Sequence, residues 1–460
     1  MKKSFTKLFS TVLVMASVLT GFTAKAQETT LAPVNMLKNK KTDVKADSII
    51  TVTKTGAPAT VKVAPKAEAA AWVPVRRLWG YAFGDLYYNQ HADATNRGPE
   101  SMYNGVPTNR NAFQFRRAYI GYDYDIDQKF TAEVLLASEP NANTGVNGTT
   151  AIQNGDDLVD GKMAFFIKNF NLRYRNIWNG TDIVVGEMST PGFALNEPGT
   201  NAPTSLSEAT WGNRFIEKTI TDVHKNNSYD IGAALQGTFD PKTKNFGYVF
   251  MVGNNTSASL LPAANPNTGF YKIFYGDLWG KFFNKQLYVD IYSDYAPTAP
   301  ATAAIGGQSH SLNKIFAAYV NPKFTIGVEA YTQKITNGVT NSGTKNVEDA
   351  TVNGLSIWIK GVVVKDKINF FARRDGYNPD TKFDGANSYT VNTNYGSYNP
   401  TVKETFYTAG LDFTPAPKIH FSPNVWLIEY KDQRSSTTTG YVGNDHNLVY
   451  RATFFYTFGK

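Results

Sequence analysis

The sequence predicts an all-β protein, a transmembrane antiparallel β-barrel of about sixteen strands with short turns at one end and long loops at the other. Three observations carry this prediction. The chain begins with an export signal, and apolar and polar residues alternate with a period of two from Trp72 onward. The last strand has an aromatic-rich face that reads Leu, Tyr, Ala, Phe, Tyr and Phe from Leu448 to Phe458.

The export signal has the three parts that a signal peptide needs. Three lysines stand within the first seven residues, an apolar stretch covers 8–22, and Ala24-Lys25-Ala26 forms a cleavage site. We therefore expect a signal peptide over 1–26. A membrane-spanning helix needs a run of about 18 apolar residues, and no later stretch is that long. The sequence therefore predicts no membrane-spanning helix.

Residues 27–71 differ in composition from the rest of the chain. They are rich in Ala, Thr, Lys, Val and Pro and contain no aromatic residue before Trp72. Such a segment cannot bury a core. We expect a flexible periplasmic tail over 27–71 and the barrel over 72–460.

Composition excludes several functional classes. Aromatic residues make up 14% of the chain and charged residues only 18%, as suits a wall with one apolar and one polar face. The formal net charge is +8, and it falls to +4 when the four lysines of the signal peptide leave. This is too little to indicate nucleic-acid binding. Cys is absent, which excludes disulfides and thiolate metal ligands.

The alternation defines each strand candidate by its phase. In 324–331, for example, Phe, Ile, Val and Ala alternate with Thr, Gly, Glu and Tyr. Short connections rich in Pro, Asn, Asp and Lys separate pairs of candidates. These predicted periplasmic turns are Asp125–Lys129, Asn176–Gly180, Asp240–Lys244, Phe283–Gln286, Asn321–Lys323, Lys365–Lys367 and Thr414–Lys418. Longer polar stretches between them are predicted outer loops, namely 139–160, 254–268, 333–351, 376–402 and 432–446.

One connection, 189–226, differs from the others because it contains helix signals. Ser205 and Glu208 form a capping box, and Trp211 lies four residues before Phe215, so an amphipathic turn or two is predicted. The segment follows the fifth strand. We expect it to fold into the barrel as a constriction loop, and the alternative is an ordinary external loop. Its candidate functional residues are Glu208, Trp211, Arg214, Glu217 and Lys218.

Charged residues in the inward phase are candidates for a pore lining. A charge at mid-depth on the lipid face would cost about 2–4 kcal/mol, so inward placement is expected. The adjacent pair Arg116-Arg117 cannot both face inward on a regular strand unless a bulge re-aims one, and the phase favours Arg117. The candidates are Arg117, Arg173, Arg175, Arg373, Arg451, Asp230, Asp290, Asp294, Glu329 and Asp412. They fall into a basic and an acidic wall, which predicts a transverse field; salt bridges within the wall are the alternative.

No catalytic constellation is recognisable in the sequence. It has no His-Glu-x-x-His, no Gly-x-Ser-x-Gly and no phosphate-binding loop. The histidines are scattered, without the spacing of metal ligands. We therefore expect no enzymatic activity, no cofactor and no metal site.

Several stretches resemble known porins. Phe115–Tyr122 is similar to the Arg-Arg-Ala-x-x-Gly strand of the phosphate-selective porin-like group. Further stretches resemble porins of Bacteroidota: 163–168, 217–222, 403–413 and 448–451. The resemblance implies a sixteen-stranded pore in the outer membrane, often trimeric, for small hydrophilic solutes. Phosphate-selective members carry an arginine ladder and a lysine cluster, whereas the inward charge of this chain is mixed.

The sequence thus predicts an outer-membrane porin that lets small hydrophilic or ionic solutes diffuse through a water-filled pore. Its expected partners are outer-membrane lipid, those solutes and further copies of the chain, with a trimer as one possibility. One alternative is a substrate-specific or loop-plugged transport barrel. Another is a closed barrel with a structural or surface-recognition role, although about sixteen strands make a barrel too wide to be filled by its own wall side chains.

Overall fold

The structure is a computed structural model that describes residues 72–459. Within this range it leaves out 94, 96, 98–100, 104–105, 140–157, 160–161, 164, 193–205, 225–227, 256–270, 299–301, 384, 386–388 and 393–399. The predicted signal peptide and the predicted tail over 27–71 lie outside the described residues.

The described residues form a closed antiparallel barrel of sixteen strands. Each strand pairs with its neighbour along the chain, and β1 pairs with both β2 and β19, which closes the ring. The barrel strands are β1 (Arg76–His91), β2 (Asn111–Asp125), β3 (Phe130–Ser138), β6 (Phe166–Trp178), β7 (Thr181–Ser189), β8 (Tyr229–Thr238), β9 (Phe246–Gly253), β10 (Ile273–Phe282), β11 (Leu287–Thr298), β12 (Gln308–Val320), β13 (Phe324–Asn341), β14 (Val347–Val364), β15 (Ile368–Asn378), β17 (Val402–Ala416), β18 (Ile419–Asp432) and β19 (Asp445–Gly459).

Five short elements lie outside this ring. They are the hairpin of β4 (Leu158–Val159) and β5 (Lys162–Met163), the strand β16 (Tyr389–Val391), and the helices α2 (Leu206–Trp211) and α3 (Ile220–His224). β16 pairs with the end of β13. No helix in the described part of the chain is long and apolar enough to cross a membrane.

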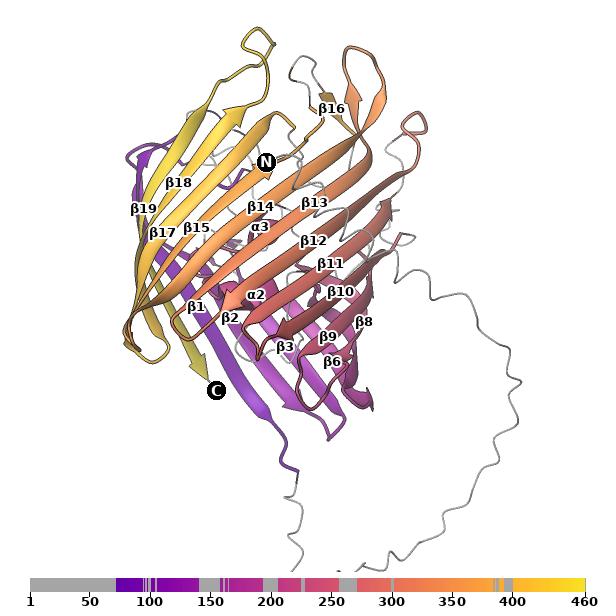
Figure 1. Cartoon of the computed structure of the whole chain (residues 1–460), viewed down its shortest axis with the longest axis vertical. Coiled ribbons are helices and arrows are strands. Elements are labelled where there is room, and N and C mark those ends of the chain that lie inside the picture. Colours follow the sequence, from indigo (N-terminus) through magenta and orange to yellow (C-terminus); the bar gives the residue numbers. More distant parts are fainter. Residues whose placement is uncertain are drawn as a thin grey trace, which may run out of the picture. The chain divides into compact units, whose positions relative to one another are not determined.

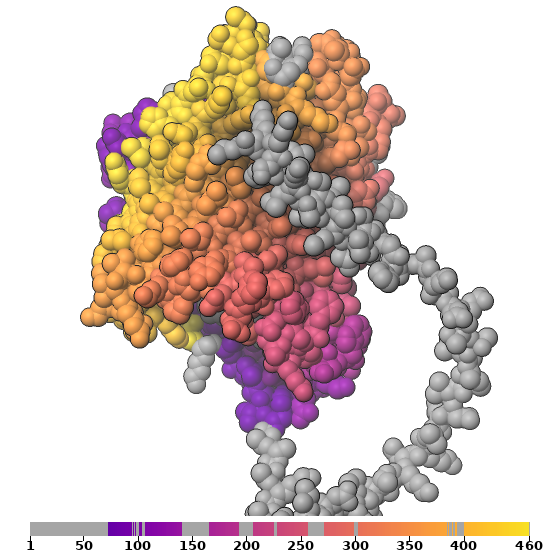
Figure 2. Space-filling view, in the orientation of Figure 1, coloured from indigo at the N-terminus to yellow at the C-terminus, as the bar shows by residue number. Residues whose placement is uncertain are grey.

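The predicted period-two alternation is present in the wall. In β13, Thr325, Glu329 and Tyr331 are buried, whereas Ile326 and Val328 are exposed. Large apolar side chains are exposed in the same way along the other strands, from Leu78 in β1 to Phe458 in β19. Figure 2 shows part of this outer face, with the colours of successive strands side by side. An apolar face of this extent is unfavourable in water and fits a bilayer.

The connections alternate in length, as predicted. All seven predicted turns join consecutive barrel strands at one end, and the longer connections lie at the other end (Figure 1). The prediction of an outer loop over 333–351 was wrong for most of its length. β13 continues to Asn341 and β14 starts at Val347, because the two strands pair again beyond a bulge at Ile335, for example Val339 with Glu348. The Thr- and Val-rich composition favours this hairpin extension.

A bulge in β2 resolves the ambiguity of the two adjacent arginines. Phe83 of β1 pairs with Arg117, the next pair is Gly84 with Phe115, and Arg116 is left without a partner in the ladder. Such an extra residue bends the strand and re-aims its side chain. Arg116 consequently reaches into the barrel, where its guanidinium lies over the ring of Phe83, 5.0 Å from the centroid.

Candidate functional site

The segment between β7 and β8 lies inside the barrel. Its described residues 206–224 contact the inner faces of strands from β11 to β15 and, across the ring from β11, of β19 and β2. α2 packs against β11, β12 and β13, and α3 packs against β14. Phe215, between the helices, stacks on Phe455 of β19 with ring centroids 4.8 Å apart. Figure 1 shows both helices behind the front wall. The segment thus crosses the interior.

Local sequence explains where α2 ends and which side chains the segment buries. α2 ends at Trp211 because Gly212 adopts a positive φ of 64°, the left-handed conformation that commonly terminates a helix. The apolar residues of the segment are buried: Trp211, Ile216 and Ile220 are all 0% exposed. Trp211 packs on Trp358 of β14 with ring centroids 5.3 Å apart. Trp211 therefore packs the end of α2 against the inner wall of the barrel.

Acidic wall residues bind the first residue of one helix and the first turn of the other. The backbone N–H of Leu206 donates to Asp290 Oδ2 at 2.7 Å, and the backbone N–H of Thr221 donates to Glu329 Oε1 at 3.3 Å. The first N–H groups of a helix lack partners within the helix and carry a partial positive charge. Asp290 and Glu329, both buried, supply those partners.

Basic wall residues bind the carbonyl groups of the same segment. Lys360 Nζ donates to Trp211 O at 2.8 Å, where α2 ends, and Arg116 Nη1 donates to Ile216 O at 3.0 Å. Arg373 donates through Nη1 to Lys218 O. Backbone N–H groups of the segment thus bind carboxylates of β11 and β13. Its backbone carbonyl groups bind cations of β2, β14 and β15.

Buried ion pairs hold the segment in shape. Arg214 Nη1 lies 2.7 Å from Asp222 Oδ2 and 3.1 Å from Glu208 Oε1. Burial disfavours the Arg214 cation, but Asp222 and Glu208 outweigh this effect and raise its pKa. Burial alone would raise the pKa of Asp222, yet Lys218 and Arg214 hold it well below its usual range. Burial lowers the pKa of Lys218.

The structure pairs four of the five predicted basic residues with acids of the wall itself. Arg173 Nη1 lies 3.4 Å from Asp182. Arg175, near the end of β6, places Nη2 at 2.7 Å from Asp125, the last residue of β2. Arg373 likewise binds Asp375 and Arg451 binds Asp85, whereas Arg117 places its Cζ 5.8 Å from the centroid of the Phe83 ring. This pattern of contacts corresponds to the salt-bridge alternative for the arginines.

The predicted acidic residues also have close partners. Tyr275 Oη donates to Asp230 and Tyr292 Oη donates to Asp294, at 2.8 and 2.7 Å respectively. Asp412 lies 3.0 Å from His420 Nδ1. In the segment itself, Glu217 lies 3.6 Å from Arg116.

Sequence reasoning missed four residues that hold the segment. The alternation of apolar and polar residues favours Arg117 over Arg116 as the inward residue, because it cannot locate a bulge. Lys314 and Lys360 stand at strand positions whose inward phase was a usable signal. Asp222 ends the stretch 217–222 that resembles porins, but nothing in the sequence showed that it pairs with Arg214.

Lys314 offers a direct test of how firmly the segment is held. Its side chain is buried, and Nζ donates to Gly192 O at 2.8 Å and to Ser207 Oγ at 3.1 Å. Lys314→Met keeps most of the volume but removes both bonds, so we expect the segment to loosen. Open-channel current noise should then rise several-fold, as gating by a mobile loop predicts. Lys323→Met, in a turn between β12 and β13, is the control and should leave the noise unchanged.

Comparisons with known proteins support the fold. No family model matches the chain, and no curated relative matches it. Among solved structures, the anion-selective porin from Comamonas acidovorans is 10% identical with a TM-score of 0.53; the match covers 84% of this chain and 100% of that one. The outer-membrane channel DcaP of Acinetobacter baumannii is 8% identical with a TM-score of 0.50, covering 84% and 97%. These similarities establish a porin-like barrel fold.

Proposed function

We propose that this chain is an outer-membrane diffusion channel for small hydrophilic or ionic solutes, narrowed by the segment 189–226. The observation that carries the proposal is the described part of this segment, 206–224, which crosses the interior of a sixteen-stranded barrel and binds the wall through Asp290, Glu329, Lys360 and Arg373. A barrel of this size is wide enough for a pore. A charged segment held across it would limit the size of the solutes that pass.

Charge of both signs beside the segment supports passage of polar solutes. Arg116, Lys360 and Arg373 of β2, β14 and β15 contact the segment, and the buried carboxylates of β10, β11 and β13, including Asp277, lie around Lys314 of β12. We propose that solutes meet a transverse field at this level, which favours dipolar molecules and small ions over apolar ones. The ion pairs within the wall weaken this field, so we expect modest rather than strict ion selectivity.

Single-channel recording tests the proposal. Full-length mature protein, refolded and inserted into a planar bilayer, should give stable conductance steps. Under a salt gradient, a reversal potential of a few millivolts to a few tens of millivolts is the expected sign of mixed charge. A folded, heat-modifiable barrel that never conducts would contradict the proposal and favour the alternatives, a plugged transport barrel or a closed surface-recognition barrel.

The setting of such a channel follows from its surface. The exposed apolar side chains of the wall suit outer-membrane lipid, with the longer connections outside the cell and the turns in the periplasm. We further propose that the chain assembles with copies of itself, with a trimer as the expected form. Cross-linking of the detergent-solubilised protein, resolved on gels without heating, would measure the number of chains.

A further inference from the structure

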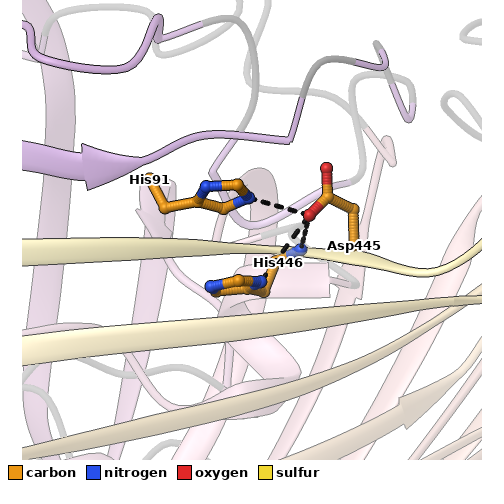
Figure 3. Close-up of side chains that lie close together, drawn as sticks. All are labelled: His91, Asp445 and His446. Carbon is orange, nitrogen blue, oxygen red and sulfur yellow. Dashed lines mark hydrogen bonds and ion pairs between the residues drawn. The ribbon is translucent and has the colours of Figure 1, made fainter.

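Three side chains that can bind a metal meet where the barrel closes. His91 ends β1, while Asp445 and His446 begin β19, the strand that pairs with β1. Figure 3 shows the two imidazole rings one above the other, with ring nitrogens of both directed at the Asp445 carboxylate. A bulge between Asn89 and His91 shifts the register of the pair, so that His91 pairs with Leu448 instead of continuing the regular ladder. This bulge brings His91 beside His446.

The donor atoms already lie near the spacing that a metal requires. His91 Nε2 is 2.9 Å from Asp445 Oδ1, and His446 Nδ1 is 3.6 Å from the same oxygen. All three donor atoms lie within 4.8 Å of one another. Around a tetrahedral ion with bonds of about 2.0–2.1 Å, neighbouring donors are about 3.3 Å apart. Rotation of the two His side chains would therefore place all three atoms around one ion.

We propose that His91, Asp445 and His446 form a Zn²⁺ site that fastens the first and last strands together. Two imidazole nitrogens and one carboxylate oxygen are ligands that Zn²⁺ accepts, whereas Mg²⁺ prefers oxygen ligands alone. The side chains of His91 and His446 are each 42% exposed, and that of Asp445 is 31% exposed. An ion can thus enter from solvent and keep water as a fourth ligand.

The two imidazole rings are stacked on each other, and they must turn to share one ion. Their centroids are 4.2 Å apart with an interplanar angle of 19°. The lone pair that binds a metal lies in the plane of the imidazole ring, so both rings must turn out of the stack for one ion to lie in both planes. The two His side chains, each 42% exposed, have room for this turn. The proposal is independent of the proposed channel function, because the site lies where β1 ends beside the start of β19 and not in the interior segment.

Zinc titration of the refolded, untagged full-length protein tests the site. Isothermal titration in a zwitterionic detergent without chelator should show about one Zn²⁺ per chain and no Mg²⁺ binding, as the ligand set predicts. His91→Gln, Asp445→Asn and His446→Gln should each weaken binding by roughly tenfold or more, since each removes one ligand. The three variants remove different ligands, so one that fails to fold leaves two tests.

His420→Gln is the matched control. His420 also pairs with an aspartate, Asp412, at 3.0 Å, but none of the described residues adds a second imidazole to that pair. The control should bind Zn²⁺ like the original protein. A second readout is thermal, because an ion that binds only the folded barrel raises its unfolding temperature. The proposal is wrong if the original protein shows no Zn²⁺ binding, or if the three variants bind as well as His420→Gln.

Discussion

Replacing residues 206–224 by a short Gly-Ser linker should increase the single-channel conductance roughly threefold or more, because it removes a segment that crosses the lumen of a wide barrel. The wall should still form, since β7 and β8 pair with each other independently of this segment. The exclusion limit for neutral sugars should rise as well, measured by swelling of liposomes that contain the protein.

A second loop replacement provides the control for this experiment. The connection between β18 and β19 covers 433–444, and its described contacts lie at the outer rim, such as Arg434 with Asp432. Substituting Gly and Ser over 435–440 should leave the conductance unchanged. If removal of 206–224 also leaves the conductance unchanged, the segment does not limit the pore and the constriction proposal fails.

Asp85→Asn should destabilise the barrel by about 3–5 kcal/mol, because it leaves the buried guanidinium of Arg451 and the partly buried guanidinium of Arg116 without their shared carboxylate. Asp85 is 0% exposed, and it binds Arg451, Arg116 (Nε at 2.8 Å) and the hydroxyl of Thr453 at 2.6 Å. The free energy of unfolding can be measured by guanidinium titration of the refolded protein in detergent. Gel mobility with and without heating would show that the variant still folds.

Two further variants separate this ion pair from a general effect of mutation. Adding Arg451→Met to Asp85→Asn should recover part of the lost stability, because the second change removes one of the unpaired cations. Asp349→Asn breaks the pair with Lys334, whose side chain is 55% exposed, and should cost at most about 1 kcal/mol. If Asp85→Asn and Asp349→Asn lower the free energy of unfolding equally, the buried ion pair of Asp85 stabilises the barrel no more than the exposed pair does.

Much of the wall was predictable, because both strand phase and turn chemistry are local properties. The alternation around Glu329 places that residue inside and Ile326 outside by sequence alone. Turns such as Asn321–Lys323 contain residues that tolerate tight backbone conformations, and Asn321 does bind the backbone N–H of Lys323 at 2.8 Å. The hairpin extension of β13 and β14 was missed because polar Thr and Asn residues suit loops and solvent-exposed strands alike.

The contacts of the candidate site were less predictable. The helix signals around Glu208 and Trp211 marked the segment, but its partners in the wall, Lys360 and Arg373, stand about 150 positions further along the chain. Phase could identify Arg373 as inward-facing without showing that Asp375 binds it. The bulge that turns Arg116 inward depends on how β1 and β2 pair, which no single strand encodes.

The sequence by itself determined the class of the protein: a chain whose period-two pattern builds a barrel with an apolar outer face, short turns and an inward row of charges. Only the tertiary structure decided which of those charges meet. Closing the ring brings β1 beside β19, and with them His91 beside His446, from opposite ends of the chain. Such meetings depend on strand register, bulges and barrel closure, which are set by pairing between distant strands rather than by local residue patterns.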